Sequence, residues 1–259
     1  SMMALRIPIS LSMIIVGCSG TILIAGWIPI LSQAKTSVWH LFSNYSLSVI
    51  PLFLLMGNLA GKAGMSEALF KFTSACLGHR KGGVAMATIG ACAGFGAICG
   101  SSLATAGTMG KVALPELRKL GYSNSLSTGT LAAGGTLGIL IPPSVILIIY
   151  SILTEQNIAK MFLAALVPGI LAILGYMIVI GLYVRFYKDS GPVKARICWK
   201  KRLLLFKNIW QIILIFLVMI FGIYLGWFTP TEGGAIGAGG TFLIAILSKK
   251  LNLKDLIDV

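Results

Sequence analysis

The stretch Gly100-Ser-Ser-Leu-Ala-Thr105 lies at the centre of the segment that decides the fold, residues 82–143. An uncharged run of small residues, 83–99, precedes it, and the run that follows it, 104–119, regains charge towards its end. A membrane-spanning helix needs about 20 mainly apolar residues, and each of these two arms is short and rich in glycine. The pattern therefore predicts a re-entrant helical hairpin that turns at Gly100, Ser101 and Ser102.

A second interruption follows the hairpin, where Pro142 and Pro143 stand inside an apolar run. Two adjacent prolines remove two backbone donors, so a continuous helix is excluded there. The apolar run resumes at 145–153, which predicts a broken membrane helix. Non-helical backbone is tolerated at membrane depth only where protein or a water-filled cavity satisfies its polar groups. We therefore expect the hairpin turn and the proline break to form a binding site.

The composition indicates the class of protein. The chain is 57% hydrophobic and 11% charged, with a mean hydropathy of +0.93, whereas soluble domains carry roughly 25% charged residues. We expect an all-α polytopic membrane protein. The net charge of +14 could suggest nucleic acid, but the basic residues lie between apolar runs. The five cysteines form no CxxC pair and the two histidines are far apart, so neither a metal centre nor an enzyme active site is expected.

The order of apolar and polar segments predicts a single membrane domain over residues 1–259, with about six crossings plus the hairpin. The first two spans occupy 7–61, with a polar link at 33–45. An interfacial amphipathic helix follows at 66–77, with Ser66 as its N-cap. The hairpin and broken helix occupy 82–153, the last three spans occupy 158–248, and 251–259 begins another interfacial helix.

The charges predict the orientation of these spans. The loop 185–207 carries eight Lys or Arg residues against Asp189 alone. Placing this loop in the cytoplasm also puts the basic segments 62–81, 111–119 and 249–250 inside. Positive charge is favoured in cytoplasmic loops, so the assignment is consistent and the hairpin is expected to enter from the cytoplasm.

Two interruptions of helical backbone within a membrane can form a site that binds an ion or a carboxylate. Broken helices expose carbonyl groups and helix ends, which coordinate Na⁺ or hold a carboxylate. The hydroxyl groups of Ser101, Ser102 and Thr105 lie near one break, and Gly134 and Gly135 permit close backbone approach near the other. These are oxygen donors, which hard cations prefer. For the small-residue run 83–96 we favour tight helix packing over binding.

Other polar positions are less specific. Asn58, inside a short span, either makes a helix–helix hydrogen bond or is a site ligand. Glu232 is expected to cap the last span together with Thr229 and Thr231. The run 107–111 resembles a phosphate-binding loop, but its glycine spacing is wrong and the next residue, Val112, carries no hydroxyl group.

Four segments together carry a family resemblance: residues 50–58, 100–116, 138–144 and 228–232. They resemble the large, DctM-like membrane subunit of tripartite ATP-independent periplasmic (TRAP) transporters, over nearly the whole chain. The resemblance implies one repeat of an inverted-repeat elevator transporter, in which residues 82–153 form the transport core. It also implies uptake of small organic acids, such as C4-dicarboxylates or sialic acid, across the bacterial inner membrane, with Na⁺ as the coupling ion.

The resemblance further implies partners and site residues. A periplasmic substrate-binding protein would deliver the solute, and a small, DctQ-like membrane subunit would brace the large one. One Na⁺ site would be formed by the hydroxyls of Ser101 and Ser102 and by the backbone of Gly138, Ile141 and Pro143, with Asn58 beside it. The candidates for the substrate cavity are Thr105, Gly134, Gly135 and Pro142.

The family's large subunit contains two inverted repeats, whereas this sequence shows one hairpin and one broken helix. We therefore expect the chain to correspond to about the N-terminal half, with the second Na⁺ site and much of the substrate cavity on other sequence. Two alternatives stay open. One is a truncated membrane scaffold that does not transport, and the other is a permease of the ion-transporter superfamily that works without a binding protein.

Overall fold

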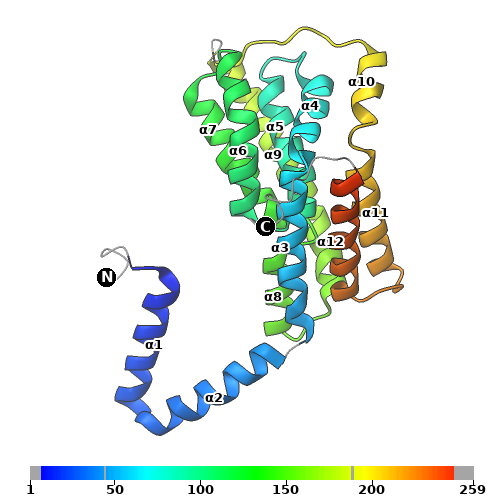
Figure 1. Cartoon of the computed structure of the whole chain (residues 1–259). Helices are drawn as coiled ribbons and strands as arrows, with labels where there is room; N and C mark the ends of the chain where they lie inside the picture. Colours follow the sequence, from blue (N-terminus) through cyan, green and yellow to red (C-terminus); the bar gives the residue numbers. More distant parts are fainter. Residues whose placement is uncertain (1–6, 44, 188–189, 248–259) are drawn as a thin grey trace. The chain divides into compact units, whose positions relative to one another are not determined.

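The computed structural model describes residues 7–43, 45–187 and 190–247, and every regular element within them is a helix (Figure 1). The all-helical prediction is confirmed for this part of the chain, and the helix expected at 251–259 lies outside it. The chain divides into two compact units, Ser1–Leu47 and Ser48–Val259. Each unit is described by itself below.

The first unit contains α1 (Ile9–Ala25) and α2 (Trp27–Ser43). Gly26 separates them with a φ of +82°, a left-handed conformation that glycine adopts without strain. The polar link predicted at 33–45 is wrong as far as Ser43, because that stretch continues α2. Its polar side chains bond within the helix, as the Thr36 hydroxyl does to the Ser32 carbonyl at 2.9 Å.

The boundary between the units falls within the short 3₁₀ turn Tyr45–Ser48, and the second unit contains ten α-helices among its described residues. In chain order they are α3 (Val49–Lys62), α4 (Met65–Leu77), α5 (Gly83–Cys99), α6 (Ser102–Lys119), α7 (Asn124–Leu140), α8 (Val145–Leu153), α9 (Ile158–Phe186), α10 (Trp199–Phe206), α11 (Trp210–Tyr224) and α12 (Pro230–Leu247).

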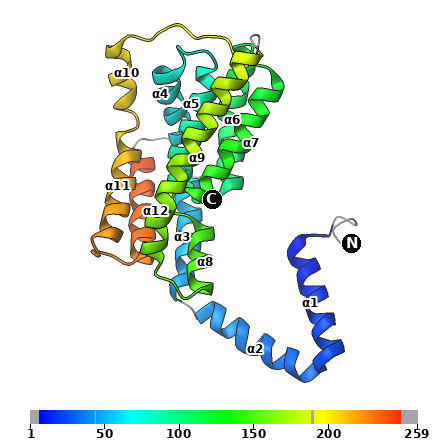
Figure 2. The same ribbon diagram turned by 180° about the vertical axis from the view of Figure 1, so that it is seen from behind.

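Helix α5 forms the centre of this unit. It packs on α3, α4, α6, α7 and α9, and 14 of its 17 residues are buried. A helix that is apolar and small on every face has no side that needs water, which explains its central position. Figure 2 shows α9 lying across the face formed by α5 and α7.

The lengths of the helices bear on how the chain crosses a membrane. Helix α9, with 29 residues and a length of about 44 Å, is long and apolar enough to span by itself. Three bent pairs among the described residues also meet these criteria: the 3₁₀ turn and α3 with α4 (65°), α7 with α8 (44°), and α10 with α11 (52°). One to four spans follow by these criteria, and the count of about six crossings stays a prediction.

Helix α4 has nearly the bounds predicted for the helix at 66–77, but it begins differently. Gly64, with a φ of +73°, occupies the N-cap position, and Ser66 is buried in the first turn. The prediction of Ser66 as the cap is therefore wrong, because the left-handed glycine turns the chain between α3 and α4 two residues earlier. Leu69 and Phe70 then bury one face of α4 in the core.

The two interruptions predicted from the sequence are both present. Helix α5 ends at Cys99 and α6 begins at Ser102, with the Ser101 hydroxyl accepting a hydrogen bond from the Ala104 N–H at 3.4 Å. Helix α7 ends at Leu140, and α8 begins after Ser144, whose hydroxyl accepts from the Leu147 N–H at 3.4 Å. A serine therefore starts each new helix as an N-cap.

The start of α12 confirms a further prediction. Glu232 Oε2 accepts hydrogen bonds from the Thr229 N–H at 2.8 Å and from the Thr229 hydroxyl at 3.0 Å. The Glu232 N–H donates in return to Thr229 Oγ1 at 3.3 Å, which completes a capping box. Thr231, also expected to contribute, is buried instead.

Candidate functional site

The hairpin turn and the proline break lie against each other. The Val145 N–H donates to the Gly100 carbonyl at 3.3 Å. Gly100 has a φ of +62°, and a Cβ atom at this position would lie 2.9 Å from the Pro143 carbonyl oxygen. Only glycine meets both conditions without strain. Two interruptions that are 40 residues apart in the sequence thus form one place in the fold.

Gly138, in the last turn of α7, is where three helices approach most closely. A Cβ atom there would lie 2.5 Å from Thr105 Oγ1 and 2.8 Å from the Ser101 carbonyl oxygen. From the other side, a Cβ atom on Gly96 of α5 would lie 2.7 Å from the Gly138 Cα atom. The backbones of α5 and α7 therefore meet at the hairpin tip without intervening side chains, and the Thr105 hydroxyl of α6 lies directly against this contact.

The end of α7 supplies carbonyl groups that have no helical donor. In an α-helix each carbonyl accepts from the N–H four residues later. For Gly138 and Ile139 that residue is Pro142 or Pro143, which has no N–H. The Val145 N–H, which would serve Ile141 in a continuous helix, is bonded to the hairpin instead. The covalent structure thus leaves the Gly138 and Ile139 carbonyls, and the break leaves the Ile141 carbonyl, without their intrahelical partners.

Thr105 is the most informative side chain of this region. It is fully buried, and its Oγ1 atom has no oxygen or nitrogen partner within the described chain. The Cys99 thiol lies within reach of this hydroxyl, but a hydrogen bond to a thiol is weak. Two other fully buried threonines of this unit, Thr88 and Thr241, donate to the carbonyl four residues earlier at 2.9 and 2.7 Å. The orphaned hydroxyl therefore indicates a ligand position at the tip.

The sequence assigned Thr105 to the substrate cavity, whereas the structure brings its hydroxyl beside the backbone of Gly138. The signal that sequence reasoning did not use is spacing. Thr105 lies four residues after Ser101, so both face the same side of the α6 start. Ser101 and Ser102 are partly exposed, and the Ser101 hydroxyl also caps α6.

The remaining predicted positions are distributed around this centre. A Cβ atom on Gly134 would meet Cys92 Sγ at 2.8 Å, and one on Gly135 would meet the Ala106 Cβ at 2.7 Å, so both glycines lie at helix-packing contacts. Ile141 is partly exposed. Pro142 and Pro143 are buried.

Asn58 is not buried beside the tip. The preceding residue, Gly57, packs against α5, and a Cβ atom on it would lie 2.6 Å from Cys99 Sγ. The Asn58 side chain is exposed on α3. The structure thus brings α3 close to the end of α5 through Gly57, and the role of Asn58 as a ligand stays a prediction.

The electrostatics of the tip come from backbone and hydroxyl groups. The sequence has no charged residue in 83–110 or in 124–153. Within the described residues no group of three or more His, Cys, Asp or Glu side chains is placed to hold a metal ion. The donors are neutral oxygens, which suit a hard monovalent cation better than a transition metal. The ends of α5 and α7 add negative partial charge, and the starts of α6 and α8 add positive partial charge.

The comparisons with known proteins agree with this architecture. Residues 1–259 match the family model described as "Tripartite ATP-independent periplasmic transporter, DctM component". The chain is 35% identical over 247 residues to the C4-dicarboxylate TRAP transporter large permease protein DctM of Vibrio cholerae. The aligned region covers 94% of this chain and 53% of that protein. It is 32% identical over 231 residues to the sialic acid TRAP transporter permease protein SiaT of Haemophilus influenzae, which covers 90% of this chain and 37% of that protein.

A second DctM protein, from Pseudomonas aeruginosa, is 36% identical over 203 residues, or 78% of this chain and 47% of that protein. The chain thus spans about half the length, or less, of the curated relatives it matches. These relatives are named as transporter permeases, not as enzymes. The match of the family model over the whole chain, together with the helical fold and its two breaks, shows that the chain belongs to the DctM family, the large permease component of the TRAP transporters.

Proposed function

We propose that this chain forms part of the large permease subunit of a Na⁺-coupled secondary transporter for a small organic acid. The observation that carries the proposal is the buried Thr105 hydroxyl, which has no oxygen or nitrogen partner within the described chain, adjoins only the weakly hydrogen-bonding Cys99 thiol, and lies against the proline-broken end of α7. A buried polar group without a hydrogen bond costs about 1–3 kcal/mol. A ligand that accepts oxygen donors would remove this cost, and Na⁺ is such a ligand.

The residues at the tip offer oxygen atoms, which are the ligands that Na⁺ binds. The Thr105 hydroxyl and the backbone carbonyls of Gly138, Ile139 and Ile141 would hold it, with Ser101 and Ser102 at the rim. When bound, the ion would supply positive charge in a region whose sequence has none. The carboxyl ends of α5 and α7 converge there and favour a cation through their partial negative charge.

The same two breaks also offer groups that can bind an anion. Helices α6 and α8 begin at the breaks, and the amino end of a helix offers free N–H groups and partial positive charge to a carboxylate. Relatives of this chain are named for C4-dicarboxylate, sialic acid and isethionate. A small organic acid is therefore the class of substrate that we propose.

The tripartite family implies, in general, a substrate-binding protein and a small membrane subunit. For this chain we propose a periplasmic binding protein, a DctQ-like small subunit and the bacterial inner membrane as its surroundings. Multi-pass insertion is supported by the apolar helices, above all α9.

The test uses the complete transporter that contains this chain, reconstituted in liposomes with its binding protein. Uptake of the radiolabelled acid is expected with an inward Na⁺ gradient and not with an equal K⁺ gradient. Thr105→Val is expected to reduce the Na⁺-driven rate at least tenfold. Thr88→Val, a matched change at a buried threonine with a satisfied hydroxyl, should leave the Na⁺ dependence intact. Equal uptake in Na⁺ and K⁺ by the unaltered transporter would contradict the proposal.

A further inference from the structure

The segment that follows α9 is tied to the base of the hairpin. The Lys194 N–H donates to the Gly78 carbonyl at 3.0 Å. The Tyr122 hydroxyl donates to the Pro192 carbonyl at 2.9 Å and accepts from the Val84 N–H at 3.2 Å. Backbone bonds of this kind fix the segment, and they hold the Lys194 side chain over the space between α4 and α6.

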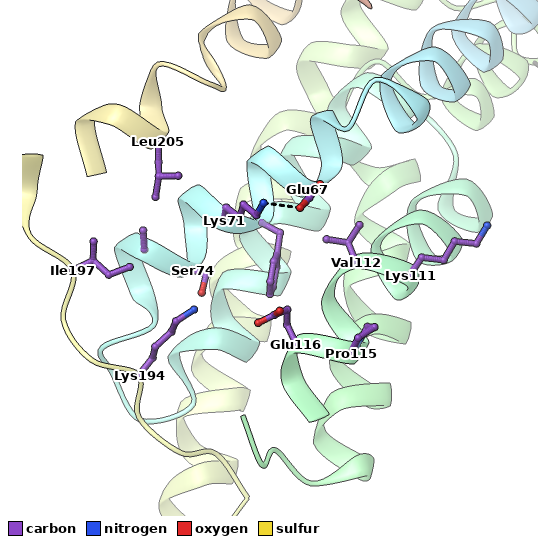
Figure 3. A pocket seen from close by; sticks show the side chains of 12 residues that line it. Glu67, Lys71, Ser74, Lys111, Val112, Pro115, Glu116, Lys194, Ile197 and Leu205 are labelled. Carbon is purple, nitrogen blue, oxygen red and sulfur yellow. Dashed lines mark ion pairs between the residues drawn. The ribbon is translucent and has the colours of Figure 1, made fainter. Parts of the chain in front are cut away.

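A cavity of about 520 Å³ lies between α4, α6 and this segment (Figure 3). Its size is in the range of small-molecule sites. Apolar side chains form much of its wall, and polar and charged side chains from all three elements reach it. The lining residues are Glu67, Phe70, Lys71, Ser74, Ala75, Lys111, Val112, Pro115, Glu116, Lys194, Ile197 and Leu205.

The charges of this cavity are not all neutralised within the protein. Glu67 pairs with Lys71 at 2.6 Å, so these two charges neutralise each other. Glu116 and Lys194 are both partly buried and extend towards the same space from opposite walls (Figure 3), yet they form no ion pair with each other. Lys111 also lines the cavity, but it is exposed and extends away from these two side chains in Figure 3. The partly buried part of the cavity therefore presents one negative group, Glu116, and one positive group, Lys194, that are held apart.

A third polar group points to a ligand independently. Ser74 is 4% exposed and lines the cavity, and its Oγ atom has no hydrogen-bond partner within the described chain. Buried hydroxyl groups are normally satisfied. Ser74 comes from α4 and Lys194 from the segment after α9, so a hydroxyl donor and an ammonium group line the same cavity.

We propose that this cavity binds the headgroup of a phospholipid that carries both a phosphate and a primary ammonium group, as phosphatidylethanolamine does. The phosphate would accept hydrogen bonds from Lys194 and Ser74, and the ammonium group would donate to Glu116. A purely anionic headgroup would leave Glu116 without a counter-charge. A choline headgroup fits less well, because its quaternary nitrogen has no N–H to donate.

A lipid, rather than free phosphoethanolamine, is favoured by the neighbouring surface. Helix α10 adjoins the cavity through Leu205 and exposes Trp199 and Leu203 at 70% and 65%. Arg202 lies over the Trp199 ring at 5.4 Å. A short helix with exposed tryptophan, leucine and basic residues is typical of the membrane interface, where acyl chains are available to cover it.

The test measures lipid binding by the purified chain in detergent with native mass spectrometry. Phosphatidylethanolamine, phosphatidylcholine and phosphatidylglycerol with identical acyl chains are titrated separately. We expect the ethanolamine lipid to bind about tenfold more tightly than either of the others, since a charge-assisted hydrogen bond contributes about 1.5–3 kcal/mol. Glu116→Gln should abolish this preference, and Ser74→Ala should weaken all three lipids.

The matched control is Glu155→Gln, which makes the same charge change as Glu116→Gln at an exposed position in the turn that follows α8. It should leave lipid binding unchanged. Ser74→Ala removes an unpartnered hydroxyl, so it tests the site without removing an internal bond. The proposal is overturned if phosphatidylglycerol binds as tightly as the ethanolamine lipid, if Glu116→Gln keeps the preference, or if water-soluble glycerophosphoethanolamine competes with an affinity equal to that of the lipid.

Discussion

Replacing Thr105 by valine removes the hydroxyl group at the hairpin tip and leaves the size and shape of the side chain nearly unchanged. Valine has nearly the same volume and the same branching at Cβ, so the packing against Gly138 is retained. The change removes one buried hydroxyl that has no oxygen or nitrogen partner and only the weakly hydrogen-bonding Cys99 thiol beside it. In a protein free of Na⁺ we therefore expect the free energy of unfolding to rise by about 1 kcal/mol, at the lower end of the cost of an unsatisfied buried group.

In the presence of Na⁺ the order of stability should reverse, so that the unaltered chain is more stable than Thr105→Val. A ligand present at 100 times its dissociation constant stabilises the folded state by about 2.7 kcal/mol. If the Thr105 hydroxyl is one of the ligands, its loss should weaken Na⁺ binding at least tenfold, or about 1.4 kcal/mol. The unaltered chain should therefore show a large Na⁺-dependent rise in unfolding temperature, and Thr105→Val should show a small one.

The assay is thermal unfolding of the purified chain in detergent, followed by tryptophan fluorescence, in NaCl and in choline chloride of equal ionic strength. Thr88→Val and Thr241→Val are the controls. Each loses a hydrogen bond within its helix, so each should be destabilised by about 1 kcal/mol and keep the full response to Na⁺. A full Na⁺ response in Thr105→Val would refute the assignment of this hydroxyl as a ligand.

Three further predictions follow from the geometry. Gly138→Ala should lower Na⁺-driven uptake by the complete transporter at least tenfold, because the new Cβ would lie 2.8 Å from a backbone carbonyl oxygen. Gly107→Ala is the control, since a Cβ there would meet no neighbouring atom within 4 Å, and it should leave uptake unchanged. An equal loss in both variants would count against a specific effect at the tip. Thr229→Ala should lower the unfolding temperature, because it removes the hydroxyl that accepts from the Glu232 N–H and donates to the Glu232 carboxylate and leaves only the backbone half of the capping box; circular dichroism melting curves that superimpose on those of the unaltered chain would contradict this. Lys119→Cys, in a variant without other exposed cysteines, should react with an impermeant maleimide only from the cytoplasmic side; labelling from the periplasm alone would reverse the proposed orientation.

The positions of the two breaks were predictable because they depend on local covalent properties. Proline lacks an N–H wherever it stands, and the Pro142–Pro143 pair ends a helix regardless of its neighbours. Gly100 was recognised by composition, and the bounds of α5 agree with the predicted arm. Features that are fixed by the chain itself could thus be located without knowledge of the tertiary structure.

The errors concern features that depend on packing. Ser66 has the residue type of an N-cap, but the turn from α3 places it against the core and gives that position to Gly64. Other features could not be judged from the sequence at all. The Thr105 hydroxyl has no oxygen or nitrogen partner, and this property exists only once α5, α6 and α7 are assembled. Gly134 and Gly135 lie where Cys92 and Ala106 approach, and their place in a substrate cavity stays a prediction.

The hydrogen bonds between the segment 190–194 and the hairpin base have a mechanical consequence. Four such bonds join this segment to the two turns that flank the hairpin, at Gly82, Ser123, Gly78 and Tyr122. In any displacement of the hairpin, the segment as far as Lys194 travels with it as one rigid body unless these bonds break. The residues that follow, 195–198, belong to no helix. The hinge between a moving hairpin and α10 is therefore expected within these four residues, and their length limits how far one body can travel past the other.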